Sequence, residues 1–251
     1  MQFSYEDHII RVNMPDQPSL MAELTRRFRA RQGFALATIN LDHLVKLRQD
    51  RQFRHAYAAQ DLIVADGNPI IWLSRLAGKD LSLLPGSDLV LPLARLAAAE
   101  NVPVALIGST QPALEAAAAR IGAEAPGIDI TACIAPAMGF DPDSDAGTQL
   151  LAQVRASGAR LCFVALGAPK QERLAARGRI EAPEIGFASI GAGLDFLAGN
   201  QQRAPEWVRK IAMEWAWRML SSPKRLAPRY ARCAAILPLE TMNALRQRSA
   251  R

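Results

Sequence analysis

Cysteine is scarce in this sequence, and its three copies follow no functional pattern. Cys133, Cys162 and Cys233 are far apart and form no CxxC pair, which is the spacing that cysteine metal sites and redox motifs use. A metal or redox centre of that kind is therefore excluded. A reducing cytoplasm is the expected setting.

Long apolar runs are absent as well. No uncharged stretch approaches the roughly 20 residues that a membrane-spanning helix needs, and Glu6 and Asp7 precede any signal-like apolar segment. We therefore expect neither a spanning helix nor a secretory leader. Half of the 251 residues are hydrophobic and 22% are charged, which is typical of a globular chain with one large domain, or one domain and an appendage.

Signatures of several enzyme classes are also missing. The sequence contains no GxSxG elbow, so a serine hydrolase of that type is not predicted. Gly191-Ala192-Gly193 lacks the third glycine of a dinucleotide fingerprint, which argues against NAD. His8, His43 and His55 have no metal-ligand spacing, and we interpret them as structural or surface residues.

Positive charge is concentrated at one end of the chain. Residues 203–251 hold eleven Lys/Arg and three Glu, a net charge of +8, and the whole chain carries +6, which leaves −2 for residues 1–202. A near-neutral body with a basic tail suggests a negatively charged partner such as a membrane surface, a nucleic acid or a phosphate. The alternative is a solvated helical surface, although tryptophans share the segment with the arginines.

Apolar runs of strand length alternate with helical patterns along the first 200 residues. The predicted strands are Phe34–Ile39, Leu62–Ala65, Val102–Ile107, Ile128–Ile134, Leu161–Leu166 and Ile185–Ile190. The predicted helices between them are Val45–Gln60, Ser87–Glu100, Gln111–Ile121 and Ser144–Ala156. Continuous apolar strands alternating with helices indicate a parallel sheet covered on both faces. We therefore predict an α/β, Rossmann-like body.

The pattern changes beyond Gly199, where prolines punctuate helical segments. A helix is predicted from Pro205 to about Leu220, and further segments are predicted to break at Pro223 and near Pro228 and Pro238. Residues 1–33 are predicted to be helical or irregular and receive no chemical role. We thus expect an N-terminal extension (1–33), a catalytic body (34–200) and a basic helical C-terminal appendage (201–251).

The residues that follow each apolar run are the candidates for a site, because open parallel sheets bind ligands beyond the carboxyl ends of their strands. These residues are rich in glycine and polar groups: Thr38, Asn40, Asp66, Gly108, Gly167, Lys170, Gln171, Gly191, Gly193 and Asp195. Glycine lets a backbone approach a ligand closely, and helix N-termini after such loops favour phosphate.

Each of these signals has an ordinary structural explanation. An Asp-Gly pair such as Asp66-Gly67 more often forms a turn than a catalytic centre. Asp141-Pro142-Asp143 resembles the DxD that holds a metal in many nucleotide-sugar enzymes, but a turn and a cap before residues 144–156 fit it better.

Together the motifs resemble one family. They are Thr-Ile-Asn (38–40), Ala-Asp-Gly (65–67), Gly-Ala-Pro-Lys-Gln-Glu (167–172), Gly-Ala-Gly-Leu-Asp-Phe-Leu-Ala-Gly (191–199), Arg-Ala-Pro-Glu-Trp (203–207), Glu-Trp-Ala-Trp-Arg (214–218) and Pro-Lys-Arg-Leu (223–226). The set, in this order, is similar to the WecG/TagA/CpsF glycosyltransferases over about residues 34–232. The first 33 residues lie outside the resemblance, and Gly139-Phe140-Asp141 departs from the Gly-Tyr-Phe-like stretch common in relatives.

The resemblance implies an inverting glycosyltransferase that uses neither a metal nor another cofactor. It would move a sugar from a UDP donor to a polyprenyl-diphosphate-linked sugar during synthesis of a bacterial surface polysaccharide, at the inner face of the cell membrane. N-acetylmannosamine, its uronic acid and glucose are all donor sugars within the family. The appendage would complete the site and meet the anionic membrane, and the oligomeric state stays open, with a homo-oligomer among the options.

The resemblance also assigns roles to residues. Asp66 becomes the candidate base, with Thr38 and Asn40 lining the pocket beside it. Gln171 would contact the donor or acceptor sugar, and Asp195 would lie near the donor nucleotide. Arg218 and Arg225 would approach the diphosphate from the appendage, although Arg218 lies four residues after Glu214 and could instead form a surface ion pair.

Two other functions stay open. An enzyme of the same fold could bind NAD or a DxD-held metal, which UDP binding in the presence of chelator would test. A non-enzymatic protein could use the basic tail as a nucleic-acid-binding arm, but the sequence contains no recognised nucleic-acid module. We therefore do not expect a nucleic-acid partner.

Overall fold

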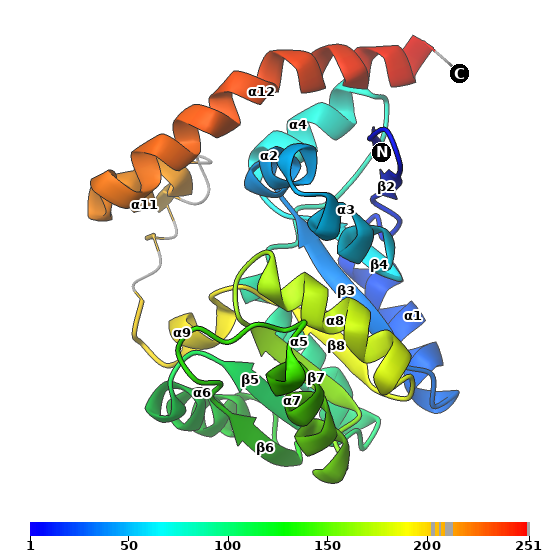
Figure 1. The fold of residues 1–251 in the computed structure, drawn as a ribbon, viewed down its shortest axis with the longest axis vertical. Coiled ribbons are helices and arrows are strands. Elements are labelled where there is room, and N and C mark those ends of the chain that lie inside the picture. The colour runs from blue at the N-terminus through cyan, green and yellow to red at the C-terminus, as the bar shows by residue number, and fades with distance from the viewer. Residues whose placement is uncertain (202–203, 206, 209–212, 250–251) are drawn as a thin grey trace.

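The computed structural model describes residues 1–201, 204–205, 207–208 and 213–249, with the side chains of Arg218, Ser221 and Arg225 outside the described part. Its centre is a six-stranded, all-parallel sheet with the strand order β4-β3-β8-β7-β5-β6 (Figure 1). The strands are β3 (Phe34–Ile39), β4 (Leu62–Ala65), β5 (Val104–Gly108), β6 (Ile130–Ile134), β7 (Leu161–Ala165) and β8 (Gly186–Ser189). The predicted α/β class and parallel sheet are confirmed.

Helices cover both faces of this sheet. They are α1 (Gln17–Arg29), α2 (Leu41–Gln49), α3 (Arg51–Ala58), α4 (Asn68–Leu76), α5 (Gly86–Ala99), α6 (Gln111–Glu124), α7 (Asp145–Ala156), α8 (Lys170–Glu181) and α9 (Gly193–Leu197). The apolar faces of α1, α5 and α6 pack on one side of the sheet, and those of α2, α3, α4, α7 and α8 on the other. Every residue of β3 is buried, as expected of a strand covered on both faces.

The predicted helix Val45–Gln60 is wrong in one respect, because it is two helices. Asp50 has extended backbone angles and separates α2 from α3. Its side chain accepts a hydrogen bond of 2.9 Å from the main-chain N–H of Phe53, which caps α3. Sequence periodicity did not reveal this break because an internal aspartate does not by itself interrupt a helical pattern.

The N-terminal segment contains strands that the sequence did not indicate. β1 (Gln2–Ser4) and β2 (Ile9–Arg11) form an antiparallel pair ahead of α1. Phe3 and Ile10 of this pair are buried in the same hydrophobic cluster as β3, β4, α2 and α3. The expectation of a helical or irregular segment holds for α1 and is corrected for β1 and β2, since three-residue strands are too short to show a clear alternation.

The C-terminal part contains α11 (Glu214–Ser221) and the long helix α12 (Pro223–Ser249). Pro228 and Pro238 lie inside α12 and do not end it, so the predicted breaks at these prolines are wrong. Packing supplies the reason: α12 lies against α2 and α4 (Figure 1), and buried contacts outweigh the roughly 3 kcal/mol that an internal proline costs.

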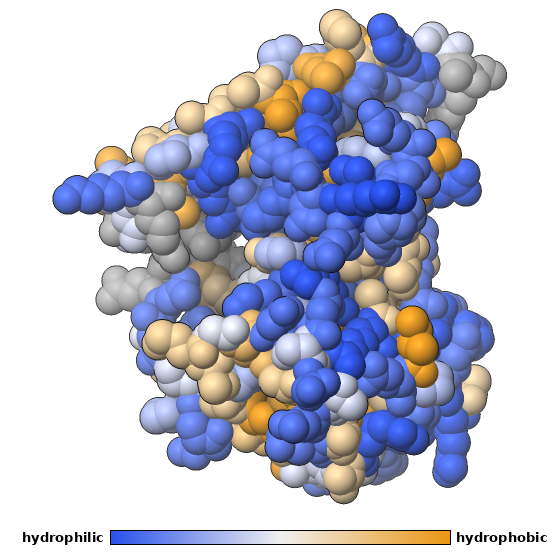
Figure 2. All heavy atoms as spheres, in the orientation of Figure 1, coloured by the Kyte–Doolittle hydropathy of each residue, from blue (hydrophilic) through white to orange (hydrophobic). Residues whose placement is uncertain are grey.

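Polar contacts join α12 to α2 and to β1. Arg48 of α2 and the buried Glu240 of α12 form an ion pair of 2.7 Å, and Gln247 exchanges two hydrogen bonds with the main chain of Gln2. These two hydrogen bonds connect the last helix to the first strand. The helix also bears exposed apolar residues, which Figure 2 shows along its length above a mostly hydrophilic face; they include Leu239, Met242 and Leu245.

Within the described part of the chain, no helix combines the length and the apolar character needed to cross a membrane.

Candidate active site

The carboxyl ends of the parallel strands bring the predicted site residues of the α/β body to one edge of the sheet. In the order of the sheet, Asp66 follows β4, Asn40 follows β3, Gly191 follows β8, Gly167 follows β7 and Gly108 ends β5. Neighbouring strands lie about 4.8 Å apart, so segments distant in sequence become adjacent. Open α/β sheets bind their ligands beyond this edge, outside the carboxyl ends of the strands.

Asp66 is held in place by the neighbouring strand. Its main-chain N–H donates to the carbonyl of Ile39 at 2.8 Å, and its carboxylate accepts from the Asn40 side-chain amide at 3.2 Å. The other amide atom of Asn40, Oδ1, accepts from the main-chain N–H of His43 at 3.1 Å and caps α2. The orientation of Asn40 is therefore determined, and with it the donor directed at Asp66.

Two further residues at this end of the sheet edge, Thr38 and His43, are buried. Thr38 lies in β3 two residues before Asn40, on the same face, and is 4% exposed. His43 is buried and its ring contacts Tyr57 and Phe53. Burial lowers the pKa of His43 to about 3, so its ring is neutral, which agrees with the structural role predicted for it.

At the other end of the edge, Ser109 and Asp195 meet. The Ser109 hydroxyl donates to the Asp195 carboxylate, joining the end of β5 to the start of α9. Gly108 has φ +114°, and a side chain there would press within 2.3 Å of the carbonyl oxygen of Ala165. Only glycine allows β5 and β7 to approach so closely. Ser109 was not among the predicted site residues, although its place directly after a strand was a usable signal.

Gln171 lies between these two ends and is almost completely buried. Its side-chain oxygen accepts from the main-chain N–H of Gly191 at 3.1 Å, and its amide nitrogen donates to Glu172 at 2.8 Å. The contact with a sugar predicted for Gln171 remains a prediction. Lys170 is the first residue of α8, and Gly193 packs closely against Val90 of α5.

An ionic cluster connects α12 to this edge. Asp42 of α2 pairs with Lys46 at 2.9 Å and with Arg229 of α12 at 3.0 Å. Lys46 also donates to the carbonyl of Ala168, in the loop before α8, at 3.0 Å. Arg218 and Arg225 lie in α11 and α12, but their side chains are outside the described part, so their predicted approach to a diphosphate remains a prediction.

Asp141 and Asp143 form a turn, as the sequence favoured. Asp141 accepts from the main-chain N–H of Asp143 at 3.1 Å, and the carboxylate of Asp143 pairs with Arg173 of α8. The helix that follows begins at Asp145 with Ser144 as its N-cap residue. No group of three or more His, Cys, Asp or Glu in the described residues is arranged to hold a metal ion.

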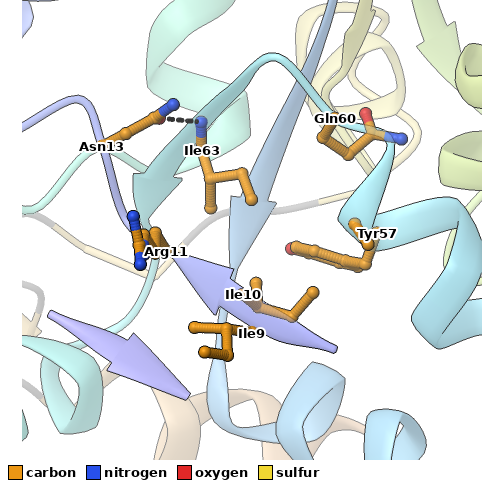
Figure 3. A pocket seen from close by; sticks show the side chains of 8 residues that line it. Ile9, Ile10, Arg11, Asn13, Tyr57, Gln60 and Ile63 are labelled. Carbon is orange, nitrogen blue, oxygen red and sulfur yellow. Dashed lines mark hydrogen bonds between the residues drawn. The ribbon is translucent and has the colours of Figure 1, made fainter. Parts of the chain in front are cut away.

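A cavity elsewhere in the body does not belong to this edge. It has a volume of about 280 Å³ and lies between β2, α3 and the first half of β4 (Figure 3). Its lining residues include Ile10, Tyr57 and Ile63, and none of the predicted site residues lines it. Because it holds no carboxylate and faces the amino half of β4, we do not assign catalysis to it.

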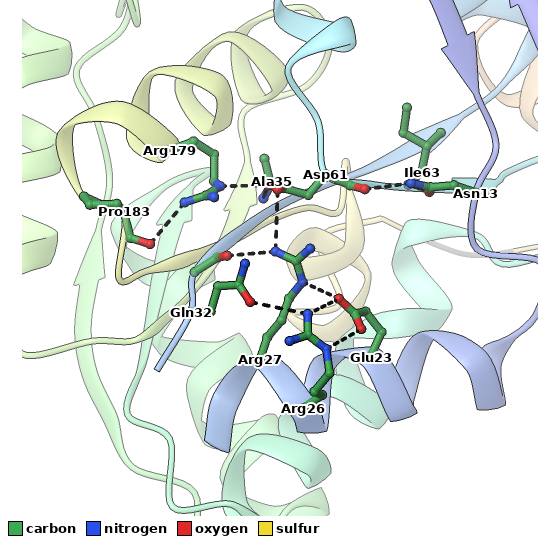
Figure 4. A network of polar contacts seen from close by, with 11 residues as sticks. Asn13, Glu23, Arg26, Arg27, Gln32, Ala35, Asp61, Ile63, Arg179 and Pro183 are labelled. Atoms are coloured by element: carbon green, nitrogen blue, oxygen red, sulfur yellow. Dashed lines mark hydrogen bonds and ion pairs between the residues drawn. The ribbon is translucent and has the colours of Figure 1, made fainter. Parts of the chain in front are cut away.

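A polar network holds the opposite end of the sheet (Figure 4). Asp61, just before β4, accepts from the main-chain N–H of Ala35 at 2.8 Å and from Arg179 at 2.7 Å. The nearly buried Arg27 of α1 pairs with Glu23 and donates to a main-chain carbonyl. These groups satisfy one another at the amino ends of β3 and β4, which indicates a structural role.

Comparison with known proteins shows which family this chain resembles along most of its length. The model of a family described as the glycosyl transferase WecG/TagA/CpsF family matches residues 8–251. The expectation that the first 33 residues lie outside the resemblance is therefore wrong for residues 8–33, which the family model includes. The chain is also 27% identical over 205 residues to a Bacillus subtilis (strain 168) protein, covering 79% of this chain and 78% of that protein. That relative is an N-acetylglucosaminyldiphosphoundecaprenol N-acetyl-beta-D-mannosaminyltransferase.

Proposed function

The chain belongs to the WecG/TagA/CpsF glycosyltransferase family, and from that premise we propose that it moves a mannosamine-type sugar from UDP to a polyprenyl-diphosphate-linked sugar. The Bacillus subtilis relative supports the acceptor and the sugar, since its name includes both an N-acetylglucosaminyl diphosphoundecaprenol and an N-acetylmannosaminyl group. The product would serve the synthesis of a cell-envelope polysaccharide.

The observation that carries this proposal is Asp66, held at the carboxyl edge of the sheet by Asn40 at 3.2 Å. A sugar hydroxyl is a poor nucleophile, so a base must take its proton as the new bond forms. The acceptor oxygen attacks the anomeric carbon, the bond from that carbon to the UDP oxygen breaks with its electron pair leaving on UDP, and the proton passes to Asp66. A single displacement of this kind inverts the anomeric configuration.

The leaving diphosphate gathers negative charge, which preorganised cations would stabilise. Arg218 and Arg225 match the family motif, and the guanidinium fork suits phosphate oxygens. The same cations make a metal unnecessary in our proposal. Asp143 supports this, because its carboxylate is already paired with Arg173.

The membrane contact would come from the C-terminal helices. Trp207, Trp215 and Leu220 are exposed, and the basic residues Lys224 and Arg232 follow in α12. Tryptophan with Lys/Arg is typical of helices that bind at a bilayer surface. We therefore propose peripheral binding through residues 201–251 at the inner face of the membrane.

A donor screen tests the proposal. The protein is incubated with a panel of UDP-sugars and a short-chain polyprenyl-diphosphate N-acetylglucosamine, and the product is identified by mass and by its anomeric configuration. We expect transfer from the UDP-mannosamine type of donor with inversion. Transfer with retention, or no transfer from any UDP-sugar, would refute the proposal.

A further inference from the structure

The side chain of Gln171 joins two loops at the carboxyl edge of the sheet. The last ladder bond of β8 runs from Ile190 N–H to the carbonyl of Val164 at 3.1 Å. The next N–H, that of Gly191, donates instead to the side-chain oxygen of Gln171 at 3.1 Å. The main-chain N–H of Gln171 donates to the carbonyl of Gly167 at 3.1 Å. Gln171 therefore fixes where the segment after β8 leaves the sheet.

Glu172 makes this orientation of the Gln171 amide the favourable one. The Gly191 N–H can only donate, so the amide oxygen must face it. The amide nitrogen then faces the Glu172 carboxyl group, which accepts at 2.8 Å. A reversed amide would place two acceptors together at Glu172 and two donors together at Gly191. An acceptor at position 172 is thus what excludes the reversed arrangement.

Packing alone does not explain an acid at this position. Glu172 is fully buried, and its Oε2 has no hydrogen-bond partner among the described residues. Ser189 of β8, on the same face of the sheet as Phe187, is also buried, and within the same part of the chain its hydroxyl has none. Burying a carboxyl group with one oxygen unsatisfied is costly, and an apolar residue of similar size would avoid that cost.

We propose that Glu172 is a positioning residue for the donor site, acting through Gln171 to hold the segment 191–195 so that Asp195 meets Ser109. The glycines at 191 and 193 give this segment little stiffness of its own. Leu194 is fully buried within the segment, and the side-chain bonds that position its polar groups are the Gly191 bond at one end and the Ser109–Asp195 bond at the other. The proposal rests on the proposed function, in which Asp195 lies near the donor nucleotide.

The surroundings of Glu172 make this hold sensitive to pH. Burial raises the pKa of Glu172 to about 7, and the nearby Lys46 ammonium opposes that rise. His43 of α2 is neutral, because burial lowers its pKa. Tyr57 of α3, whose pKa is raised by burial and by the negative charges of Glu172 and Asp66, stays protonated. Glu172 consequently changes charge near neutrality, and its ionised form is the stronger acceptor for the Gln171 amide.

The test is amide hydrogen exchange of the segment 190–197 in the full chain, which needs no substrate. Glu172→Leu removes the acceptor, Glu172→Gln keeps an acceptor oxygen that cannot ionise, and Glu181→Gln is the matched control at the far end of the same helix. We expect exchange at least about 10-fold faster in Glu172→Leu, as the loss of a hydrogen bond to a charged group allows. The wild type should gain protection from exchange between pH 6 and pH 8. Glu172→Gln, compared with the wild type at each pH, should show no such gain.

Kinetics then connect the segment to the donor. In Glu172→Leu the KM for the UDP-sugar should rise more than kcat falls, because binding is affected more than proton transfer. Unchanged exchange in a folded Glu172→Leu protein would overturn the inference. If that variant does not fold, the Glu172→Gln profile decides, and persistence of the full pH-dependent gain would overturn it. If exchange is faster in Glu172→Leu but the wild type transfers no sugar from any UDP-sugar, the positioning role of Glu172 is supported and the proposed donor is refuted.

Discussion

The side-chain amide of Asn40 donates a hydrogen bond of 3.2 Å to the carboxylate of Asp66, across the carboxyl ends of two adjacent strands. Asn40 also caps α2 through its amide oxygen. One side chain therefore both begins a helix and orients the candidate base. Because Asn40 and Asp66 are 26 positions apart in sequence, this pairing exists only in the folded chain.

Replacing Asp66 by asparagine should abolish most turnover. Asp66→Asn keeps the shape of the side chain but cannot accept the proton of the acceptor hydroxyl, so kcat should fall by roughly 10²–10⁴-fold, the usual contribution of acid–base catalysis. Steady-state kinetics on a soluble acceptor measure this, and thermal unfolding controls for the fold. Near-normal kcat in a folded variant would remove Asp66 from the mechanism.

Asn40→Asp separates the two roles of this residue. Aspartate is as good an N-cap as asparagine, so the free energy of unfolding should change by less than about 1 kcal/mol. The new carboxylate cannot donate to Asp66, and like charges at hydrogen-bond distance disfavour the ionised form that a base needs. Turnover should therefore fall by about 10-fold or more. Loss of stability without loss of turnover would mean that the cap is the only role of Asn40.

Activity should survive excess chelator. Asp141→Asn with Asp143→Asn should leave most turnover and cost about 1 kcal/mol of stability at most, since the pair with Arg173 is partly exposed. The assay is transfer with and without EDTA. Activity that disappears with chelator and returns with magnesium or manganese would contradict the arginine-based account.

The stability of the protein should carry the signature of Glu172. Its pKa is raised from 4.5 to about 7 by burial, so the folded state binds the proton more tightly than the unfolded state. The tighter binding of this proton stabilises the folded protein. The stabilisation is fully present below pH 4.5 and is lost as pH rises towards 7. Relative to that of Glu172→Gln, the free energy of unfolding of the wild type should fall by up to about 3 kcal/mol across this pH range. Denaturant unfolding at a series of pH values measures the difference, and parallel curves would show that Glu172 does not ionise there.

Surface cations of α12 should contribute to membrane binding and not to turnover. Changing Lys224 and Arg232 to alanine should weaken binding to anionic vesicles by about 1 kcal/mol per charge at most, and the loss should shrink at higher salt. Arg229 is kept in this variant because it pairs with Asp42. Turnover on a soluble acceptor should stay unchanged. Vesicle binding that is insensitive to both charges would locate the membrane contact elsewhere.

Much of the fold followed from short patterns. The runs Phe34–Ile39 and Leu62–Ala65 were predicted with their observed bounds, because a strand buried on both faces is a continuous apolar run. The carboxyl-edge location of Asp66, Asn40 and Gly191 followed from the same parallel arrangement. The β1–β2 pair and the break at Asp50 did not, since their signals are only a few residues long.

The sequence by itself determined the α/β class, the parallel sheet, the family and the residues at the ends of its strands, because hydrophobic periodicity and local motifs are properties of consecutive residues. Tertiary structure decided what no local pattern contains: that α12 runs unbroken through two prolines, that Asn40 meets Asp66 and Ser109 meets Asp195, and that Glu172 is buried with its amide partner Gln171. Each of these depends on contacts between distant segments, whose packing and hydrogen bonds outweigh the local preferences of the chain.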